Sequence, residues 1–583
     1  MWLWTNPYRN RNRQTSFEEG GDNFTALLSK KKMYRMNSKR SRKHQIIKFF
    51  FFLIFLTLNL SEFSEVYPSS DSLNQPILFP GWPKFFSREG HSDKTFSLVL
   101  ANLDTLSDLE IVGGFYDSLY VWRFDGTNLN NWPIMVKPEL ALFRDLPAIG
   151  DMDGNGELDI AITKWRRGQF TSFLHVFDKN GSLIKGFPVE FTGWSATAPA
   201  LYDLDGDGKL EIIASGQVHY DLDTLVYVYD YKGEILPGWP QRVANLPYEY
   251  IAQQPAVGDL DGDGKPEIVA TGSQCIYAWH IDGTPVKGWP VKAESGFYFG
   301  WLHHVVLSDL DNDGYLEVLA CAFHEYPEFN GYVAVWRYDG TYMPGFPKYY
   351  EFEPNSTPIP GDIDNDGYKE IVFVTGEFVL GLPNIHVLRI DGTEMPGWPV
   401  YHFGANYDDL ALADFDGDNS VDIILTSNYA SDIFVYHNDG TLITDNPMAY
   451  HGSPFACPNF NDINKDSILD LALLTGLEGY YVYLFNMNVP YHPEKILWGK
   501  LFHDNYNTNN TEFGVIRKKG DFNNNGSPDI TDVIFLLNYL FKNGKKPGYP
   551  YQADVNCDSR INVSDLLQLY NYLFKNGKPL CSS

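Results

Sequence analysis

A nine-residue stretch in the middle of the chain carries the residue types of a divalent-cation loop. The run DLDGDGKPE places Asp259, Asp261, Asp263 and Glu267 at positions 1, 3, 5 and 9. Carboxylate oxygens at alternate positions of a tight, glycine-containing loop can converge on one hard cation, and the backbone carbonyl of Lys265 at position 7 adds another oxygen. The pattern is that of an EF-hand calcium loop without its twelfth residue, so it predicts a Ca²⁺ site.

The loop recurs at intervals of about fifty residues, which is the sequence mark of a repeat architecture. A first copy, 102–110, has Leu106 at position 5, and no metal is expected there. The alternative to calcium is a set of plain acidic turns, but crowded carboxylates repel one another unless a cation lies among them. Six further copies in register therefore favour calcium: Asp151, Asp153, Asn155 and Asp159; Asp203, Asp205, Asp207 and Glu211; Asp309, Asp311, Asp313 and Glu317; Asp362, Asp364, Asp366 and Glu370; Asp414, Asp416, Asp418 and Asp422; Asp462, Asn464, Asp466 and Asp470.

Short β-rich runs surround each loop. In the copy described first, the run 251–257 leads into the loop, and the runs 267–270 and 276–281 follow it. An Asp282-Gly283 turn of the hairpin type then precedes another run, which contains Trp289-Pro290. Four strands per repeat, arranged around an axis, form a β-propeller, an architecture that leaves few exposed sheet edges. The sequence therefore predicts a mainly β fold.

An aromatic residue followed by proline marks one strand of most repeats. One interpretation makes these aromatics a ring of sugar-stacking platforms. The other packs each of them between neighbouring sheets, and we favour it because their spacing follows the strand pattern. The pairs are Trp82-Pro83, Trp132-Pro133, Phe187-Pro188, Trp239-Pro240, Trp289-Pro290, Phe346-Pro347 and Trp398-Pro399.

The two ends of the repeat region predict how the ring closes. The first aromatic-Pro strand, near 80–85, precedes the first loop, whereas the last loop is followed by 480–485 without such a strand in its own register. The N-terminal strand is thus expected to complete the last blade, and the eight loops predict eight blades. Seven blades are the alternative, if the first or eighth copy lies outside the ring.

These motifs over residues 76–508 resemble the FG-GAP/VCBS repeats of integrin α-subunit propellers and of many secreted bacterial proteins. The resemblance implies a propeller with calcium between the first two strands of each blade, and a role in adhesion or in binding a glycan or protein ligand. Some polysaccharide lyases share a related eight-bladed calcium propeller, so the resemblance also leaves an enzyme open.

The last part of the chain, 517–583, changes from a strand pattern to a helix pattern. Two twelve-residue loops each open an apolar run that ends in Lys-Asn-Gly, a helix-stop signal. Their oxygen-bearing positions 1, 3, 5, 9 and 12 are Asp521, Asn523, Asn525, Asp529 and Asp532, and then Asp554, Asn556, Asp558, Asn562 and Asp565. The duplicated loop and helix resemble a type I dockerin, which implies two calcium ions, a cohesin partner and a small α-helical, EF-hand-like module. Ser559 stands where the second loop should have glycine, which predicts a weaker second site.

The composition and the N-terminus indicate the compartment. A formal net charge of −29 with 16% aromatic residues excludes a nucleic-acid binder by charge and a disordered chain by composition. Residues 1–65 contain a basic segment, 30–44, and an apolar one, 46–60, as in a secretory signal. The protein is therefore expected to be secreted or at the cell surface, and to touch a membrane only if this signal is an uncleaved anchor.

The sequence contains none of the common catalytic signatures. It has no Gly-x-Ser-x-Gly, no His-Glu-x-x-His, no phosphate loop and no dinucleotide fingerprint. We therefore predict no catalytic residues and favour a secreted, calcium-binding propeller that acts as a binding or adhesion module and is attached to an extracellular complex through a dockerin-like domain. The alternative is a carbohydrate-active enzyme of the polysaccharide lyase type with the same C-terminal domain.

Overall fold

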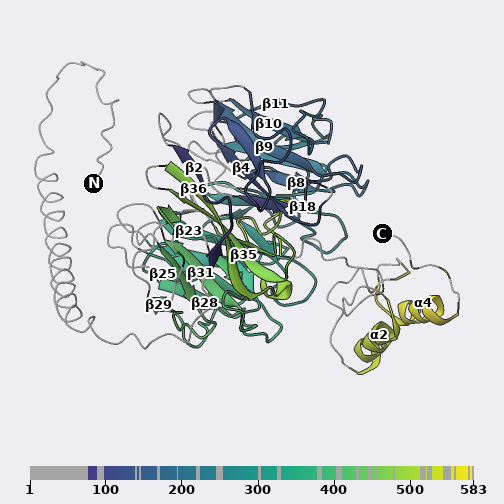
Figure 1. Ribbon diagram of the computed structural model, residues 1–583. Helices are drawn as coiled ribbons and strands as arrows, with labels where there is room; N and C mark the ends of the chain where they lie inside the picture. Colours follow the sequence, from purple (N-terminus) through teal and green to yellow (C-terminus); the bar gives the residue numbers. More distant parts are fainter. Residues whose placement is uncertain are drawn as a thin grey trace, which may run out of the picture. The chain divides into compact units, whose positions relative to one another are not determined.

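A computed structural model of the protein describes most of residues 76–511 and the two helices that follow (Figure 1). Within the described part of the chain, no helix has the length and apolar content needed to cross a membrane. The signal segment predicted at 1–65 lies outside that part. The described ranges are 76–87, 98–104, 106–137, 141–142, 146–166, 171–193, 195–217, 224–243, 254–299, 304–324, 330–376, 384–401, 410–427, 432–443, 448, 450–454, 457–476, 479–511, 520, 528–542, 553, 555–556, 560–575, 578 and 580.

The strands of this part form eight antiparallel sheets, which are the eight blades of a β-propeller. The eight-blade prediction is therefore confirmed over seven. Blade 1 consists of β3 (Val99–Ala101), β4 (Glu110–Phe115), β5 (Ser118–Trp122) and β6 (Ile134–Met135). Blade 2 consists of β7 (Ala141–Leu142), β8 (Ala148–Gly150), β9 (Asp159–Arg166), β10 (Thr171–Phe177) and β11 (Val189–Thr192). Blade 3 consists of β12 (Ser195–Ala196), β13 (Ala200–Tyr202), β14 (Glu211–Gln217), β15 (Thr224–Tyr229) and β16 (Gln241–Val243).

The next four blades repeat this plan. Blade 4 consists of β17 (Ala256–Gly258), β18 (Glu267–Thr271), β19 (Cys275–Trp279) and β20 (Val291–Lys292). Blade 5 consists of β21 (Phe297–Phe299), β22 (Val306–Ser308), β23 (Glu317–His324), β24 (Gly331–Trp336) and β25 (Lys348–Tyr350). Blade 6 consists of β26 (Ile359–Gly361), β27 (Glu370–Thr375), β28 (Asn384–Leu388) and β29 (Val400–Tyr401). The described strands of blade 7 are β30 (Leu410–Ala413), β31 (Asp422–Ser427) and β32 (Asp432–Tyr436).

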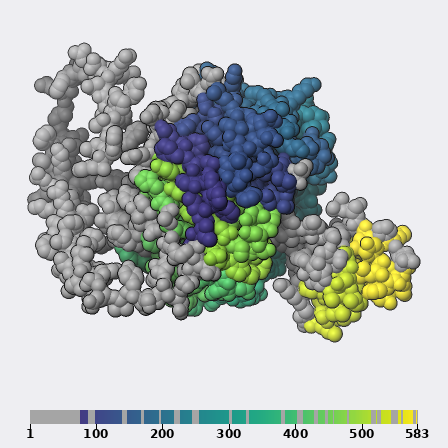
Figure 2. All heavy atoms as spheres, in the orientation of Figure 1, coloured from purple at the N-terminus to yellow at the C-terminus, as the bar shows by residue number. Residues whose placement is uncertain are grey.

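Blade 8 combines strands from both ends of the propeller. It contains β33 (Ser453–Pro454), β34 (Asn459–Asn461), β35 (Ile468–Gly476) and β36 (Gly479–Pro490), together with β1 (Ile77–Leu78) and β2 (Lys84–Ser87). Strand β2 pairs antiparallel with β36, with Lys84 opposite Val482. The purple N-terminal strand accordingly lies against the green last blade in Figures 1 and 2. The predicted closure of the ring by the N-terminal strand is confirmed.

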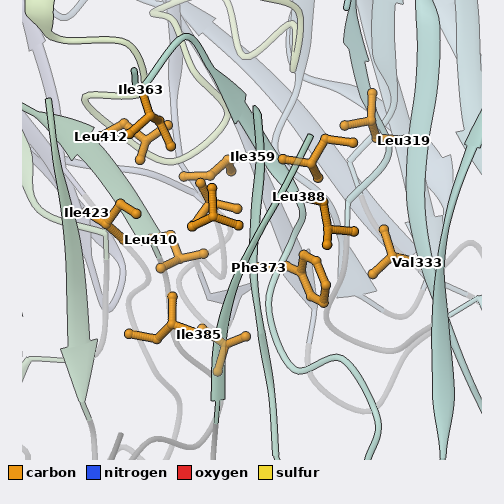
Figure 3. Close-up of a cluster of buried hydrophobic side chains, with 14 of the residues drawn as sticks. Leu319, Val333, Ile359, Ile363, Phe373, Ile385, Leu388, Leu410, Leu412 and Ile423 are labelled. Atoms are coloured by element: carbon orange, nitrogen blue, oxygen red, sulfur yellow. The ribbon is translucent and has the colours of Figure 1, made fainter. Parts of the chain in front are cut away.

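The second strand of each blade is apolar on both faces because each sheet packs between two neighbours. Every residue of β27 is buried, whereas β2 in the outermost position alternates half-buried and exposed residues. Figure 3 shows how the core forms between blades. There, Val333 from blade 5, Phe373 from blade 6 and Ile423 from blade 7 belong to one buried apolar cluster. The blades are thus held together by hydrophobic contacts between sheets, which remove apolar surface from water.

The aromatic-Pro pairs lie at the junctions between blades. Trp289 is 6% exposed, and its indole Nε1 donates to the carbonyl of Tyr338 in the next blade at 2.8 Å. The preceding Gly288 has φ of +98°, and a Cβ there would lie 1.9 Å from the carbonyl oxygen of Asp339, so only glycine fits this close approach. Packing between sheets, and not sugar stacking, is confirmed for the whole set, whose members are all buried: Trp82, Trp132, Phe187, Trp239, Trp289, Phe346 and Trp398.

A segment after the last blade, which we call the axial segment (495–511), was not predicted. Its carbonyl oxygens accept hydrogen bonds from the first strands of successive blades, from the N–H groups of Ile149, Leu201, Val257, Leu307, Leu412 and Phe460. One segment can reach the first strands of so many blades only along the propeller axis. The short 3₁₀ helix η1 (Pro493–Lys495) leads into it.

The C-terminal module contains helices α2 (Ile530–Lys542) and α4 (Val563–Phe574). Leu536 from α2 and Leu569 from α4 are fully buried against each other's helix, together with Val555 from the second loop. Asn562 caps α4, because its side chain accepts from the N–H of Ser564 and the Asp565 side chain returns to the Asn562 N–H. Both helices predicted from the duplicated pattern are therefore present.

Removing the closing strand should destabilise the whole ring. Deletion of residues 76–87 exposes the edge of β36, and it also removes the stacking of Phe86 on Phe115 of blade 1, whose ring centroids are 4.1 Å apart. We expect a melting temperature lower by many degrees in calorimetry. The control is a variant that lacks residues 1–75 and so keeps β1 and β2. If the two variants were equally stable, the closure of the ring by the N-terminal strand would be contradicted.

Loss of one polar side chain at the axis should also be costly. Asn507 is 0% exposed, and its Nδ2 donates to the carbonyls of Pro147 at 3.2 Å and Pro199 at 3.0 Å. Asn507→Ala leaves these buried acceptors unpaired, which costs about 1–3 kcal/mol. Denaturant unfolding measures the change, with exposed Asn180→Ala as a control expected within about 0.5 kcal/mol of the parent. Equal effects would show that the axial contacts do not stabilise the ring.

Candidate metal centres

Each acidic loop connects the strand that precedes it to a strand that begins at or just before its position-9 acid. In blade 4 the loop runs from the end of β17 at Gly258 to the start of β18 at Glu267. Its backbone amides hold the carboxylates inward: Gly264 N–H donates to Asp259 Oδ2 at 3.0 Å, and Asp263 N–H donates to Asp261 Oδ1 at 3.3 Å. Backbone hydrogen bonds of the turn therefore hold these carboxylates in place.

The acid at position 9 of each loop is buried at the start of the second strand. Glu267 is 0% exposed, and its Oε2 accepts from the N–H of Leu260 at 2.9 Å. All seven other loops repeat the bond from the N–H at position 2 to the carboxylate at position 9, in the pairs Leu103 and Glu110, Met152 and Asp159, Leu204 and Glu211, Leu310 and Glu317, Ile363 and Glu370, Phe415 and Asp422, and Ile463 and Asp470. This acid therefore fixes the loop to the strand.

Burial of these acids raises their pKa strongly. Loss of hydration, and next the repulsion from Asp261, raises the pKa of Glu267 to about 9. The pKa of Glu317 is also raised to about 9, mainly by burial. Burial is again the first cause for the acids whose pKa is raised to about 7: Asp159, Glu211, Glu370, Asp422 and Asp470. A site that holds such groups ionised at neutral pH needs a nearby positive charge.

The donor atoms of several loops converge closely enough to surround an ion. One oxygen from each acid lies within 4.8 Å of the others in four groups, namely Asp203, Asp205 and Glu211; Asp259, Asp261 and Asp263; Asp309, Asp311 and Glu317; Asp362, Asp364 and Glu370. The buried Oδ1 atoms of Asp362 and Asp470 have no hydrogen-bond partner among the described residues. All-oxygen groups with spare buried acceptors fit a hard cation such as Ca²⁺.

A fifth group contains a residue that the sequence did not indicate. Asp416 and Asp418 of the seventh loop are joined by His437, again with donor atoms within 4.8 Å of one another. His437 follows β32, across the sheet from the start of β31, and its Nδ1 lies 3.1 Å from Asp422 Oδ1. The prediction from sequence considered only positions 1, 3, 5 and 9 of the loop, so it missed a residue that follows β32.

Two other loops meet an arginine from the equivalent place. In the degenerate first loop, the guanidinium of Arg123 lies 2.7 Å from Asp104 Oδ2. In the sixth loop, Arg389 lies 3.0 Å from Asp364 Oδ2. Arg123 thus supplies positive charge where position 5 has lost its acid, and Arg389 shares a carboxylate with the predicted cation.

The C-terminal loops are described only in part. Asp521, Asn523, Asn525, Asp554, Asp558 and Ser559 lie outside the described residues. The position-12 acids, Asp532 and Asp565, are 0% exposed at the starts of the two helices. Asp532 accepts from the N–H of Asp529 at 2.8 Å, and Asp565 accepts from the N–H of Asn562 at 2.9 Å. In both loops, the carboxylate at position 12 thus accepts a hydrogen bond from the N–H at position 9. An EF-hand loop likewise uses an acid at position 12 as a ligand.

Comparison with protein families identifies both parts of the chain. The FG-GAP-like repeat family matches residues 203–270, 259–320 and 309–373, and the dockerin type I domain matches residues 519–574. The chain carries FG-GAP-like repeats and a type I dockerin domain. Both resemblances drawn from the motifs are confirmed. No curated protein matches the sequence.

Two solved structures are similar to this chain over most of its length. The Vibrio cholerae biofilm matrix protein Bap1 is 13% identical with a TM-score of 0.50, over 73% of this chain and 92% of that one. The rhamnogalacturonan lyase YesW is 13% identical with a TM-score of 0.41, over 72% of this chain and 93% of that one. At such identities the likeness shows the fold alone.

The buried position-9 acids predict how stability depends on pH in a chelator. Their folded pKa lies above the unfolded value of about 4.3, so the stability they contribute is present below that pH and is lost as the pH rises toward about 9. The melting temperature without divalent cations should therefore fall from pH 5 to pH 9. Glu267→Gln should reduce this fall, and exposed Glu234→Gln should not; thermal unfolding at several pH values measures both.

Proposed function

We propose that the protein is an extracellular, calcium-stabilised β-propeller that acts as a binding module and is attached to a multi-protein complex through its dockerin domain. The observation that carries the proposal is the joining of a complete FG-GAP-type propeller to a type I dockerin in one chain. Dockerin domains bind cohesin modules, so a cohesin is the proposed partner. The ring would present the ligand-binding surface, for a glycan or a protein.

The dockerin helices support docking by their exposed apolar side chains. On α2, Ile534 is 51% exposed and Phe541 is 61% exposed. On α4, Leu567 is 56% exposed and Phe574 is 50% exposed. Soluble domains rarely expose so many large apolar side chains on two short helices without a partner. The helices thus offer a surface for a protein module.

Calcium is proposed as the ion of propeller loops two to six and eight and of both dockerin loops, and a divalent cation is proposed for loop seven. Three observations support calcium. Carboxylates cluster in the loops, some buried carboxylate oxygens lack a hydrogen-bond partner among the described residues, and burial raises the pKa of the position-9 acids so that they ionise only at a free-energy cost unless a cation is near. Filled loops would let these acids remain ionised, and an ion that binds only the folded ring stabilises it by mass action. Added Ca²⁺ should accordingly raise the melting temperature in neutral buffer, and Mg²⁺ should do so much less because it demands a smaller octahedral site.

Binding to a cohesin module tests the proposal. The full chain should bind a type I cohesin in Ca²⁺ and lose it in chelator, because metal-bound loops and helices of such small modules fold together. The double substitution Ile534→Asp and Leu567→Asp should weaken binding at least tenfold in calorimetry, by placing charge in an apolar interface. Leu183→Asp, at a 43% exposed site of the propeller, is the matched control and should bind as the parent does.

Two outcomes would overturn parts of this proposal. If no type I cohesin binds the folded parent in Ca²⁺, the attachment role is wrong. If the protein releases unsaturated sugars from pectic or other polysaccharides, the propeller is an enzyme of the lyase type and not a binding module.

A further inference from the structure

One position outside the acidic loops contacts the loop in four blades, through Arg123, His280, Arg389 and His437. It is the residue that directly follows the second strand after each loop, and we call it the flanking position. In blades 2 and 3 the position holds an aspartate that instead accepts from amides of its own hairpin turn. The occupants of the flanking position differ in charge from blade to blade: Arg123, Asp178, Asp230, His280, Arg337, Arg389 and His437 for blades 1 to 7. This position is therefore one source of chemical difference between loops that share most of their acids.

Side chains at the flanking position reach the carboxylates of the loop. Arg123 and Arg389 contact the position-3 acids, Asp104 and Asp364, at 2.7 and 3.0 Å. His280 and His437 both reach the position-9 acid, with Nδ1 at 3.0 Å from Glu267 Oε1 and at 3.1 Å from Asp422 Oδ1. A cation or a ring nitrogen at this position therefore contacts the acids of the loop.

In the seventh loop, the flanking histidine belongs to the converging group of donor atoms. A ring nitrogen of His437 and one oxygen each of Asp416 and Asp418 lie within 4.8 Å of one another. The His437 side chain is 33% exposed, so an ion can reach it from solvent, and Asp422, fully buried behind it, holds the ring. The contact of a ligand imidazole with a carboxylate is the usual arrangement at protein metal sites.

Nitrogen donors change which metal a site prefers. Ca²⁺ takes oxygen ligands, whereas imidazole together with carboxylates suits borderline divalent ions such as Zn²⁺. We propose that the seventh loop is a mixed Asp/His site that holds a borderline divalent metal of the Zn²⁺ type, while the all-oxygen loops take Ca²⁺. This inference rests on the proposed function only in treating the seventh loop as a cation loop.

Zinc retention in excess calcium tests the site. The full-length protein is saturated with millimolar Ca²⁺, equilibrated with a small excess of ZnCl₂, dialysed against Ca²⁺ buffer and analysed for bound zinc by atomic emission. We expect the parent to retain one zinc per chain more than His437→Asn, in which the amide replaces the imidazole. His280→Asn, at the same position in blade 4, should retain as much zinc as the parent, because His280 contacts the position-9 acid Glu267 and is not part of the converging group of Asp259, Asp261 and Asp263.

A gain-of-site variant provides a second readout. Arg389→His places an imidazole at the flanking position of the sixth loop and removes a competing guanidinium, so it should retain one zinc more than the parent. Anomalous scattering at the zinc edge from crystals of the parent should place the ion beside His437.

The outcomes separate this inference from the proposed function. Equal zinc in the parent and in His437→Asn, or zinc lost from His280→Asn instead, overturns the mixed site. If Ca²⁺ still raises the melting temperature of every variant in that case, the variants are folded and the calcium proposal stands. If zinc is retained through His437 but Ca²⁺ stabilises nothing, the mixed site stands and the calcium proposal fails.

Discussion

The propeller depends on satisfying the backbone groups that its innermost strands turn toward the axis. In a ring of radial sheets, each blade ends at the axis with an edge strand whose N–H groups have no neighbouring strand to bond. Here the axial segment takes that role, and its carbonyls accept from blade after blade, for example from Val257 at 3.0 Å and Leu307 at 2.9 Å. Its asparagines add side-chain donors, such as Asn510 Nδ2 to the carbonyl of Val257 at 3.0 Å. The axial segment thus pairs with inner strands of six of the eight blades.

The same segment links the ring to the acidic loops. The N–H of Asp414, the first acid of the seventh loop, donates to the carbonyl of Lys495 at 3.2 Å. Lys495 Nζ in turn donates to Asn365 of the sixth loop at 2.6 Å. A loop that begins at the end of an inner strand cannot shift without moving that strand. The acidic loops and the axial segment are thus joined by direct hydrogen bonds.

The repeated features of the chain could be predicted from its sequence, whereas the features that occur only once could not. Eight loops in register, and a strand such as 84–87 left over at the N-terminus, were sufficient for the blade number and the closure, because each copy supports the others. The axial segment has no second copy, and its contacts join residues as distant in sequence as Asn505 and Leu100, so no local pattern marks it. His437 was missed for a related reason, since a strand pairing, and not sequence proximity, brings it to the seventh loop.

The glycines and aromatic residues at the blade junctions hold neighbouring blades in a fixed arrangement. A Gly-aromatic-Pro corner of one blade meets the Gly turn of the next, as Gly238 meets Asp282 and Trp239 donates to Ile281 at 2.6 Å. Each junction therefore fixes the angle between two sheets through backbone contact, which leaves little freedom for side chains to alter it. The flanking residue belongs to this Gly turn through its backbone, as when the Gly283 N–H donates to the carbonyl of His280 at 2.9 Å. Its side chain takes no part in the junction, so the chemistry of each loop can change there while the backbone contact stays the same.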